Sequence, residues 1–253
     1  MLEFDILVIG GGPGGYSLAI SAAKHGMRVA LFEKDRLGGT CLNVGCIPTK
    51  YLVDKANAME KIRSLVNQEI FRDAGAFSFR KIQKGKTQVS DKLVGGVQYL
   101  LKKHGVEVIH GSAVLQKDRV VNCGGQEYHG HWVVIATGSV PLTIPIPGYE
   151  YCIDSTGALG LADLPDSMVV MGGGVIGLEL ACAFAAYGTD VTIIEMMPEL
   201  MQAVLGACAV TAAELISGLI INDALKLHLW DYSAMPYNFL GQVCMSYFFL
   251  WII

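Results

Sequence analysis

Residues 4–15 read FDILVIGGGPGG, an apolar run that leads directly into a cluster of glycines. Such a run is typical of a buried parallel strand, and the small apolar residues at 19–23 can form the packed side of a following helix. Gly26 ends that helix, and residues 28–33, RVALFE, read as a second strand. The stretch therefore predicts a βαβ unit.

The glycines have the spacing of a dinucleotide-binding turn. Gly10 permits the sharp turn, Gly12 lets a pyrophosphate approach the backbone, and Gly15 allows the helix to pack closely on the strand. Free N–H groups and the helix dipole favour phosphate charge at this point. Glu33 follows Gly15 by 18 residues, where its carboxylate can accept hydrogen bonds from ribose hydroxyls. The alternative is a glycine-rich turn beside a solvated glutamate.

The same pattern returns at a constant distance of 162 residues. Its members are residues 168–171, Gly172, Gly174, Gly177 and residues 190–195, which end on Glu195. Because the glycines and the acid recur together, chance is a poor explanation. We expect a second dinucleotide here, and NAD rather than NADP, because Glu195 would repel a 2′-phosphate.

The charge balance and the cysteines limit the class of protein. The chain has 19 Lys and Arg against 23 Asp and Glu, with a net charge of −4. Because no block of one sign occurs, we expect no nucleic-acid partner. The seven cysteines are an odd number, and Glu3 and Asp5 stand where a signal peptide would be basic, so a reducing compartment is predicted. We expect no metal site, and Cys182, in the helix after the second glycine turn, reads as an ordinary core residue.

Between the two glycine turns, helices and short strands are predicted. Residues 51–66 and 87–104 read as helices, and residues 132–138 as a buried strand that enters a turn. A small antiparallel excursion is expected at residues 106–109, 113–115, 119–122 and 126–129.

Residues 38–50 read GGTCLNVGCIPTK. Cys41 and Cys46 lie five positions apart beside a predicted helix start, and could close a reducible disulfide whose thiolate the helix N-terminus stabilises. Spacing alone leaves two buried apolar cysteines as an equal alternative.

With this stretch, the sequence resembles the class I pyridine nucleotide-disulfide oxidoreductases, and within them the dihydrolipoamide dehydrogenases. The resemblance covers residues 1 to about 200. Leu42 and residues 47–49 are more similar to the lipoamide enzymes than to glutathione or mercuric reductases. The resemblance implies a cytoplasmic flavoprotein in which electrons pass from dihydrolipoamide through the disulfide and FAD to NAD. A dithiol substrate, with a lipoyl group as the preferred choice, follows from it.

The resemblance also implies roles for individual residues. Cys41 would exchange with the dithiol, Cys46 would lie against the flavin, and Lys50 would sit beside flavin N5 and pair with Glu179. A solvated helix cation is the alternative for Lys50, and a core residue for Ala113. The further positions that match FAD contacts are Gly39, Thr40, Ala113, Thr137, Gly138 and Ser139.

The expected fold class is α/β, with two Rossmann-type units and an apolar helical tail. The domains would be an FAD-binding domain with the redox disulfide at 1–150, an incomplete NAD-binding domain at 151–200, and the tail at 201–253. Residues 203–253 contain only four charged residues, so the tail reads as either a transmembrane or a buried soluble helix.

The tail suggests a second interpretation of the chain. Residues 218–245 are similar to bacterial ABC-transporter permease-like membrane proteins, and the family's homodimer interface, with its catalytic His, is not visible in the sequence. We therefore expect a truncated enzyme of low activity. The alternative is a non-catalytic membrane-associated fusion or remnant, for which a joined reading frame is a hypothesis.

Overall fold

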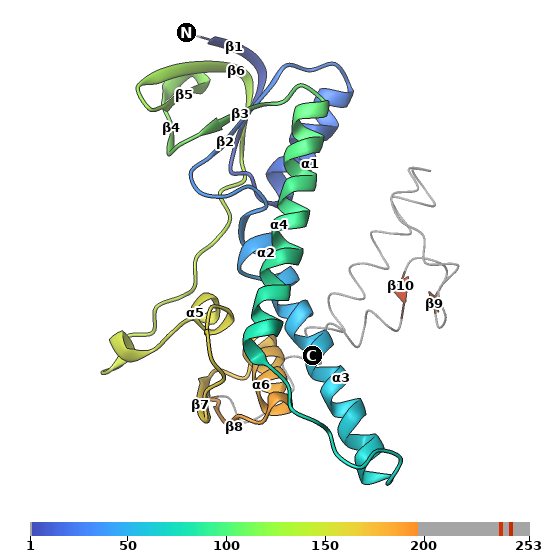
Figure 1. Ribbon diagram of the computed structural model, residues 1–253. Coiled ribbons are helices and arrows are strands. Elements are labelled where there is room, and N and C mark those ends of the chain that lie inside the picture. The colour runs from blue at the N-terminus through green and yellow to red at the C-terminus, as the bar shows by residue number, and fades with distance from the viewer. Residues whose placement is uncertain (1, 197–237, 240–242, 245–253) are drawn as a thin grey trace. The chain divides into compact units, whose positions relative to one another are not determined.

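In the computed structural model of the chain, a six-stranded sheet organises the first of two units (Figure 1). The structure describes residues 2–196, 238–239 and 243–244. The units are Met1–Asp163 and Leu164–Ile253. The strand order of the first sheet is β3-β2-β1-β6-β5-β4.

The parallel part of this sheet is built around β1 (Leu2–Ile9), which lies between β2 (Val29–Glu33) and β6 (Gln126–Ile135). β3 (Glu107–His110) extends it beyond β2. Val8 pairs with Leu31 on one side and with Val134 on the other. Val8 and Leu31 are fully buried, so the apolar run of the sequence is the centre of the sheet, as predicted.

Helix α1 (Pro13–Lys24) follows β1 and completes the predicted βαβ unit. Gly12 is its N-cap, and Pro13 stands at the first helical position, where a missing N–H costs nothing. Ala19 and Ile20 pack into the same core cluster as Val8 and Leu31. The helix is therefore held by its apolar side directly against the sheet.

The antiparallel excursion is present, but its last strand differs from the prediction. β4 (Ala113–Leu115), the 3₁₀ helix η1 (Lys117–Arg119) and β5 (Val120–Cys123) precede β6. The sequence suggested separate strands at 126–129 and 132–138, whereas β6 is continuous. Gly130 does not interrupt the strand. Its missing side chain makes room for Leu7 of β1, because a Cβ at Gly130 would lie 2.7 Å from Leu7 Cγ.

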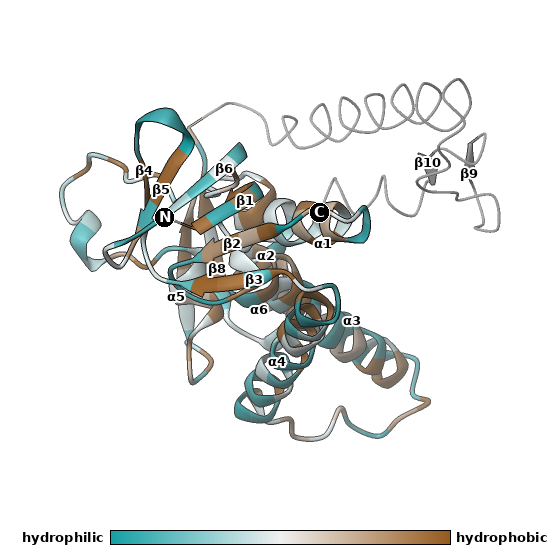
Figure 2. Ribbon diagram, turned by 90° about the horizontal axis from the view of Figure 1, so that it is seen from above, coloured by the Kyte–Doolittle hydropathy of each residue, from teal (hydrophilic) through white to brown (hydrophobic). Residues whose placement is uncertain are grey.

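Three helices connect β2 to β3. They are α2 (Gly39–Asn43), α3 (Cys46–Asn67) and α4 (Phe79–Lys103). α3 and α4 begin earlier than predicted from the sequence, and Ser78 caps α4 by accepting a hydrogen bond from the Lys81 N–H. Figure 2 shows hydrophobic and hydrophilic residues along both long helices, and the buried side of α4 includes Val94, Val97 and Leu101.

The remaining elements of the first unit are η2 (Tyr149–Tyr151) and α5 (Ser155–Leu159). α5 is tied to α4, because the Lys86 ammonium donates to the Leu159 carbonyl and Arg80 pairs with Asp163.

The second unit repeats the βαβ pattern on a smaller scale. β7 (Ser167–Met171) and β8 (Asp190–Ile194) pair in parallel, and α6 (Val175–Tyr187) connects them. Cys182 on α6 is exposed, so the expectation that it belongs to the core was wrong. The physical reason is that α6 buries its other side, which includes Phe184 and Tyr187.

The predicted helical tail is described at only four residues. These form a short antiparallel pair of β9 (Asn238–Phe239) and β10 (Val243–Cys244), so a continuous helix through them was a wrong prediction. Phe and Val favour strands, which accounts for the pairing. The other residues of 201–253, and with them the permease-like resemblance and the transmembrane alternative, lie outside the described residues. Among the helices that are described, none is long and apolar enough to cross a membrane.

Candidate functional site

The first glycine turn joins β1 to α1 through contacts that leave no room for side chains. Gly10 has a φ of +108°, and a Cβ there would lie 2.2 Å from the Ala136 carbonyl oxygen. A Cβ at Gly15 would lie 1.8 Å from the Gly10 carbonyl oxygen. By contrast, a Cβ at Gly12 would meet only Gly39 Cα, at 3.8 Å, among the described atoms within 4 Å. Gly10 and Gly15 thus serve packing, while the Cβ position of Gly12 has only an ordinary contact.

Glu33 holds this turn from the end of β2. Its Oε2 accepts a hydrogen bond from the Gly11 N–H at 2.7 Å, and its Oε1 accepts one from the Asp35 N–H at 2.8 Å. The residue is 8% exposed. A carboxylate oxygen has two acceptor positions, so each oxygen keeps one for a ribose hydroxyl. The Gly11 contact was not predicted from the sequence.

The second glycine turn has the same geometry in the second unit. The Gly173 N–H donates to Glu195 Oε2 at 2.6 Å, and Gly172 has a φ of +99°. A Cβ at Gly177 would lie 2.4 Å from the Gly172 carbonyl oxygen, whereas one at Gly174 would meet no described atom within 4 Å. Each contact corresponds to one in the first turn at the offset of 162 residues seen in the sequence.

The two cysteines of the GGTCLNVGCIPTK stretch lie at adjoining helix ends. Cys41 is in the middle of α2, and Cys46 is the first residue of α3. Both are free thiols, and their side chains share a hydrogen bond. Helix α2 and the start of α3 thus bring the two thiols into contact.

The environment distinguishes the two thiols. Partial burial, the hydrogen bond that the Cys41 thiol donates to Cys46 and the charge of Cys46 raise the pKa of Cys41 to about 11, and the charge of Lys50 opposes them. Cys46 is exposed, whereas Cys41 is half-buried. Cys41 is therefore the thiol that keeps its proton in the reduced pair.

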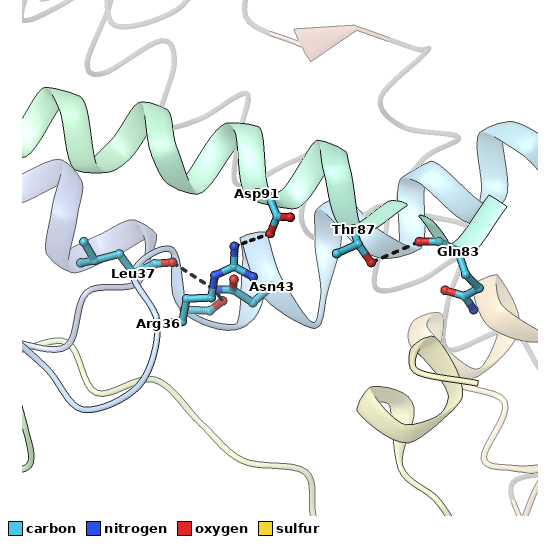
Figure 3. A network of polar contacts seen from close by, with 7 residues as sticks. Arg36, Leu37, Asn43, Gln83, Thr87 and Asp91 are labelled. Carbon is cyan, nitrogen blue, oxygen red and sulfur yellow. Dashed lines mark hydrogen bonds and ion pairs between the residues drawn. The ribbon is translucent and has the colours of Figure 1, made fainter. Parts of the chain in front are cut away.

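A polar network holds the segment before α2. The Asn43 amide donates to the Leu37 and Gly39 carbonyls at 3.0 and 2.9 Å, and Arg36 forms an ion pair with Asp91 of α4 (Figure 3). The sequence did not predict these contacts. The one residue that could have indicated them is Asn43, a polar side chain at the last position of the short helix α2.

The other predicted flavin contacts fall into two groups. Thr137, Gly138 and Ser139 follow β6 after Ala136, whose N–H donates to the Ile9 carbonyl at 2.8 Å next to the first glycine turn. Ala113 begins β4 and packs against the core cluster around Phe32. The structure thus brings the Thr137 backbone to the turn, where its N lies 3.1 Å from the position of a Cβ at Gly10, whereas Gly138 and Ser139 are exposed beyond it and Ala113 has a packing contact.

The remaining predicted residues are distributed over α2, α3 and α6. Gly39 lies against Gly12, since a Cβ at Gly39 would be 2.7 Å from Gly12 Cα. Thr40 is exposed on α2. Lys50 is on α3, one turn after Cys46, and Glu179 is on α6 in the other unit. The Lys50–Glu179 pair therefore stays a prediction. Among residues 2–196 and the two short strands, no cluster of three or more His, Cys, Asp or Glu could hold a metal ion.

Comparison with known proteins places these features in one family. Residues 4–217 match the family described as pyridine nucleotide-disulphide oxidoreductase. The chain belongs to this family. The match extends beyond residue 200, the limit suggested by the sequence alone. Members of the family are oxidoreductases that use FAD and a pyridine nucleotide, so the enzyme class and both cofactors predicted from the sequence are those of the family.

Individual relatives support the assignment. Dihydrolipoyl dehydrogenase of Bacillus subtilis is 44% identical over 206 residues, which are 78% of this chain and 45% of the relative. That of Mycoplasma genitalium is 36% identical over 233 residues, covering 89% and 50%. The HOCl-induced flavoprotein disulfide reductase RclA from Escherichia coli superposes with a TM-score of 0.69 at 34% identity, covering 79% and 43%. The chain spans about half the length of the relatives that it matches.

Proposed function

We propose that this chain carries the flavin and redox-disulfide part of a dihydrolipoamide dehydrogenase-like enzyme, with FAD on the first glycine turn and NAD on the second. The observation that carries the proposal is the contact of Cys41 on α2 with Cys46 at the start of α3. The first residue of α2, Gly39, touches Gly12 of the glycine turn. A dithiol-reactive pair is thereby joined to a phosphate-binding turn.

The first turn fits the diphosphate of a dinucleotide. The Cβ position of Gly12 has only an ordinary contact, the first turn of α1 contains no acidic residue, and its free N–H groups point toward the N-terminus of the helix. Glu33 would bind the ribose, and Thr137 to Ser139 would line the same turn from β6. FAD bound there would supply an acceptor for two electrons.

The second turn fits a dinucleotide for the same reasons. Gly174 has an open backbone, and Glu195 is the acid at the end of β8 that would accept from a ribose hydroxyl. Its negative charge supports NAD in preference to NADP.

The cysteines divide the chemistry of the dithiol step. A thiolate of dihydrolipoamide attacks Cys41, the Cys41–Cys46 bond breaks, and the electron pair leaves on Cys46. The second thiolate of the substrate then displaces Cys41, which takes up a proton because its pKa is about 11. The balance is one disulfide reduced to a thiol and a thiolate, one dithiol oxidised to a disulfide, and one proton of the dithiol released to solvent.

A pair of cysteine variants tests these roles. In the FAD-loaded chain, Cys46→Ser should abolish the long-wavelength absorption that a thiolate beside flavin produces on two-electron reduction. Cys41→Ser should keep this absorption and block exchange with lipoamide. Cys152→Ser, at an exposed free cysteine outside the pair, is the matched control and should behave as wild type. Identical spectra for the Cys41 and Cys46 variants would contradict the assignment.

A second candidate function rests on the composition of residues 203–253, which contain four charges in 51 residues. This candidate is a non-catalytic chain that attaches to a membrane through the charge-poor segment. Flotation with phospholipid vesicles, with and without residues 203–253, tests this candidate. Equal flotation of both forms, or none, would exclude it.

A further inference from the structure

Helix α2 is too short to hold Cys41 in place by itself. It comprises five residues, and its N-cap Gly38 has a φ of +95° and receives no side-chain cap within the described part of the chain. Isolated helices of this length are unstable, because few hydrogen bonds offset the cost of ordering the first turn. The position of Cys41 must therefore depend on contacts outside the helix backbone.

Asn43 supplies such contacts from the last position of α2. Its Nδ2 donates to the Gly39 carbonyl, at the first helical residue, and to the Leu37 carbonyl, before the helix. Both amide protons are used, and the two bonds span the whole of α2. Its Oδ1 is buried and has no hydrogen-bond partner among the described residues, so the side chain of Asn43 acts through its two donors.

The segment that Asn43 binds also contacts the dinucleotide turn. The Gly38 N–H donates to the Gly11 carbonyl at 2.8 Å, and Gly39 lies against Gly12. On the other side, Leu42 is buried in the core cluster that includes Val94 of α4. The segment from Leu37 to Asn43 is therefore fixed at one end by the glycine turn and at the other by the core, and Asn43 links these two ends.

We propose that Asn43 is a positioning residue that holds Cys41 against Cys46 through the Leu37 and Gly39 carbonyls. The inference rests on the proposed function in one respect, that Cys41 is the thiol that exchanges with substrate. It adds a residue outside the reacting pair that sets the reactivity of Cys41.

Thiol alkylation measures this position without flavin or turnover. At pH 8 a thiol with a pKa of about 11 is about 0.1% ionised, whereas one with the ordinary value near 8.5 is about one-quarter ionised. A thiolate of lower pKa is a weaker nucleophile, which offsets part of this difference. Alkylation of Cys41 should therefore become about tenfold faster when Cys41 loses its contact with Cys46.

The experiment uses the full 253-residue chain, reduced and then treated with iodoacetamide at pH 8, with labelling of Cys41 and Cys152 quantified by peptide mass spectrometry. Cys152 is exposed and serves as internal standard. Asn43→Asp keeps the shape and replaces both donated hydrogen bonds with repulsion between oxygens. We expect the Cys41/Cys152 ratio to rise about tenfold. Asn67→Asp, at the exposed last residue of α3, is the matched control and should leave the ratio unchanged.

A general loss of structure is recognised by labelling of Cys123, which is buried in the wild type. If Asn43→Asp labels Cys123, Asn43→Ala, which removes the donors without adding charge, replaces it, and the same rise at Cys41 is expected. A ratio within about twofold of wild type in a folded Asn43 variant, or an equal rise in Asn67→Asp, would overturn the proposal. Failure of the flavin spectra in the cysteine variants would instead affect the proposed function alone.

Discussion

Substituting Gly15 by alanine should destabilise the first unit far more than the same change one residue earlier. The Cβ added by Gly15→Ala would lie 1.8 Å from the Gly10 carbonyl oxygen, well inside the 3.0 Å below which real Cβ contacts are essentially never found. Both partners belong to the backbone or are fixed to it, so no flexible side chain can move to relieve the overlap. Helix α1 must shift away from β1.

The shift would disturb the contacts of α1 with the sheet, including Ala19, which is fully buried. Overpacking of this kind costs about 1–3 kcal/mol, and we expect the upper end of that range because the clash is with a backbone atom. Gly14→Ala is the control, since a Cβ at Gly14 would meet no described atom within 4 Å. Alanine in a helix is about 0.5–1 kcal/mol more favourable than glycine, so this variant should be slightly stabilised.

Urea unfolding of the full chain, followed by circular dichroism at the helix band, measures both changes as shifts of the midpoint. The expected order of midpoints, from highest to lowest, is Gly14→Ala, wild type, Gly15→Ala. Gly177→Ala repeats the test in the second unit, where the Cβ would lie 2.4 Å from the Gly172 carbonyl oxygen. If Gly14→Ala and Gly15→Ala unfolded at the same urea concentration, the close contact between α1 and Gly10 would be refuted.

Three other measurements address individual contacts. Gly12→Ala should keep the unfolding midpoint, because its Cβ would have an ordinary 3.8 Å contact, but should weaken FAD binding at least about tenfold, as measured by flavin fluorescence titration. The rate of Cys41 alkylation should keep rising from pH 8 until the pH passes about 11, the pKa to which burial raises this thiol, and a plateau near pH 9 would be inconsistent with that burial. The hydrogen bond and charge of Arg80 lower the pKa of Asp163. The ion pair should therefore persist at neutral pH and be lost as the pH falls through this lowered pKa. NMR titration of the Asp163 carboxyl should show that Arg80→Gln returns its pKa to the ordinary value.

The sequence predicts the parts of this fold that depend on local patterns. The βαβ order, both glycine turns and the antiparallel excursion follow from apolar runs and glycine spacing, because backbone geometry at those positions has few solutions. The sequence does not predict the continuity of β6, since Gly130 reads as a break until the packing of Leu7 against it is known. Exposure of Cys182 was missed for a similar reason, because the buried side of α6 depends on neighbouring elements.

For the candidate site, the residue types were predictable and their contacts were not. Cys41 and Cys46 are identifiable by the resemblance of residues 38–50 to a known family, whereas the hydrogen bonds of Asn43 depend on how the chain turns between Leu37 and Gly39. The acceptor role of Glu33 toward Gly11 also requires the ends of β1 and β2 to meet. Such contacts arise between segments and leave no periodic signal in the sequence.

The bonds from Gly11 to Glu33 and from Gly173 to Glu195 have a kinetic consequence. Each bond is made by the protein's own atoms, so the backbone entropy of the turn is lost during folding and not during binding. A ligand then meets a rigid surface, and association should proceed in one phase whose rate is proportional to nucleotide concentration, with no slower isomerisation after it. The acids of both turns would thereby fix the backbone that meets the phosphates as well as accept hydrogen bonds from the ribose.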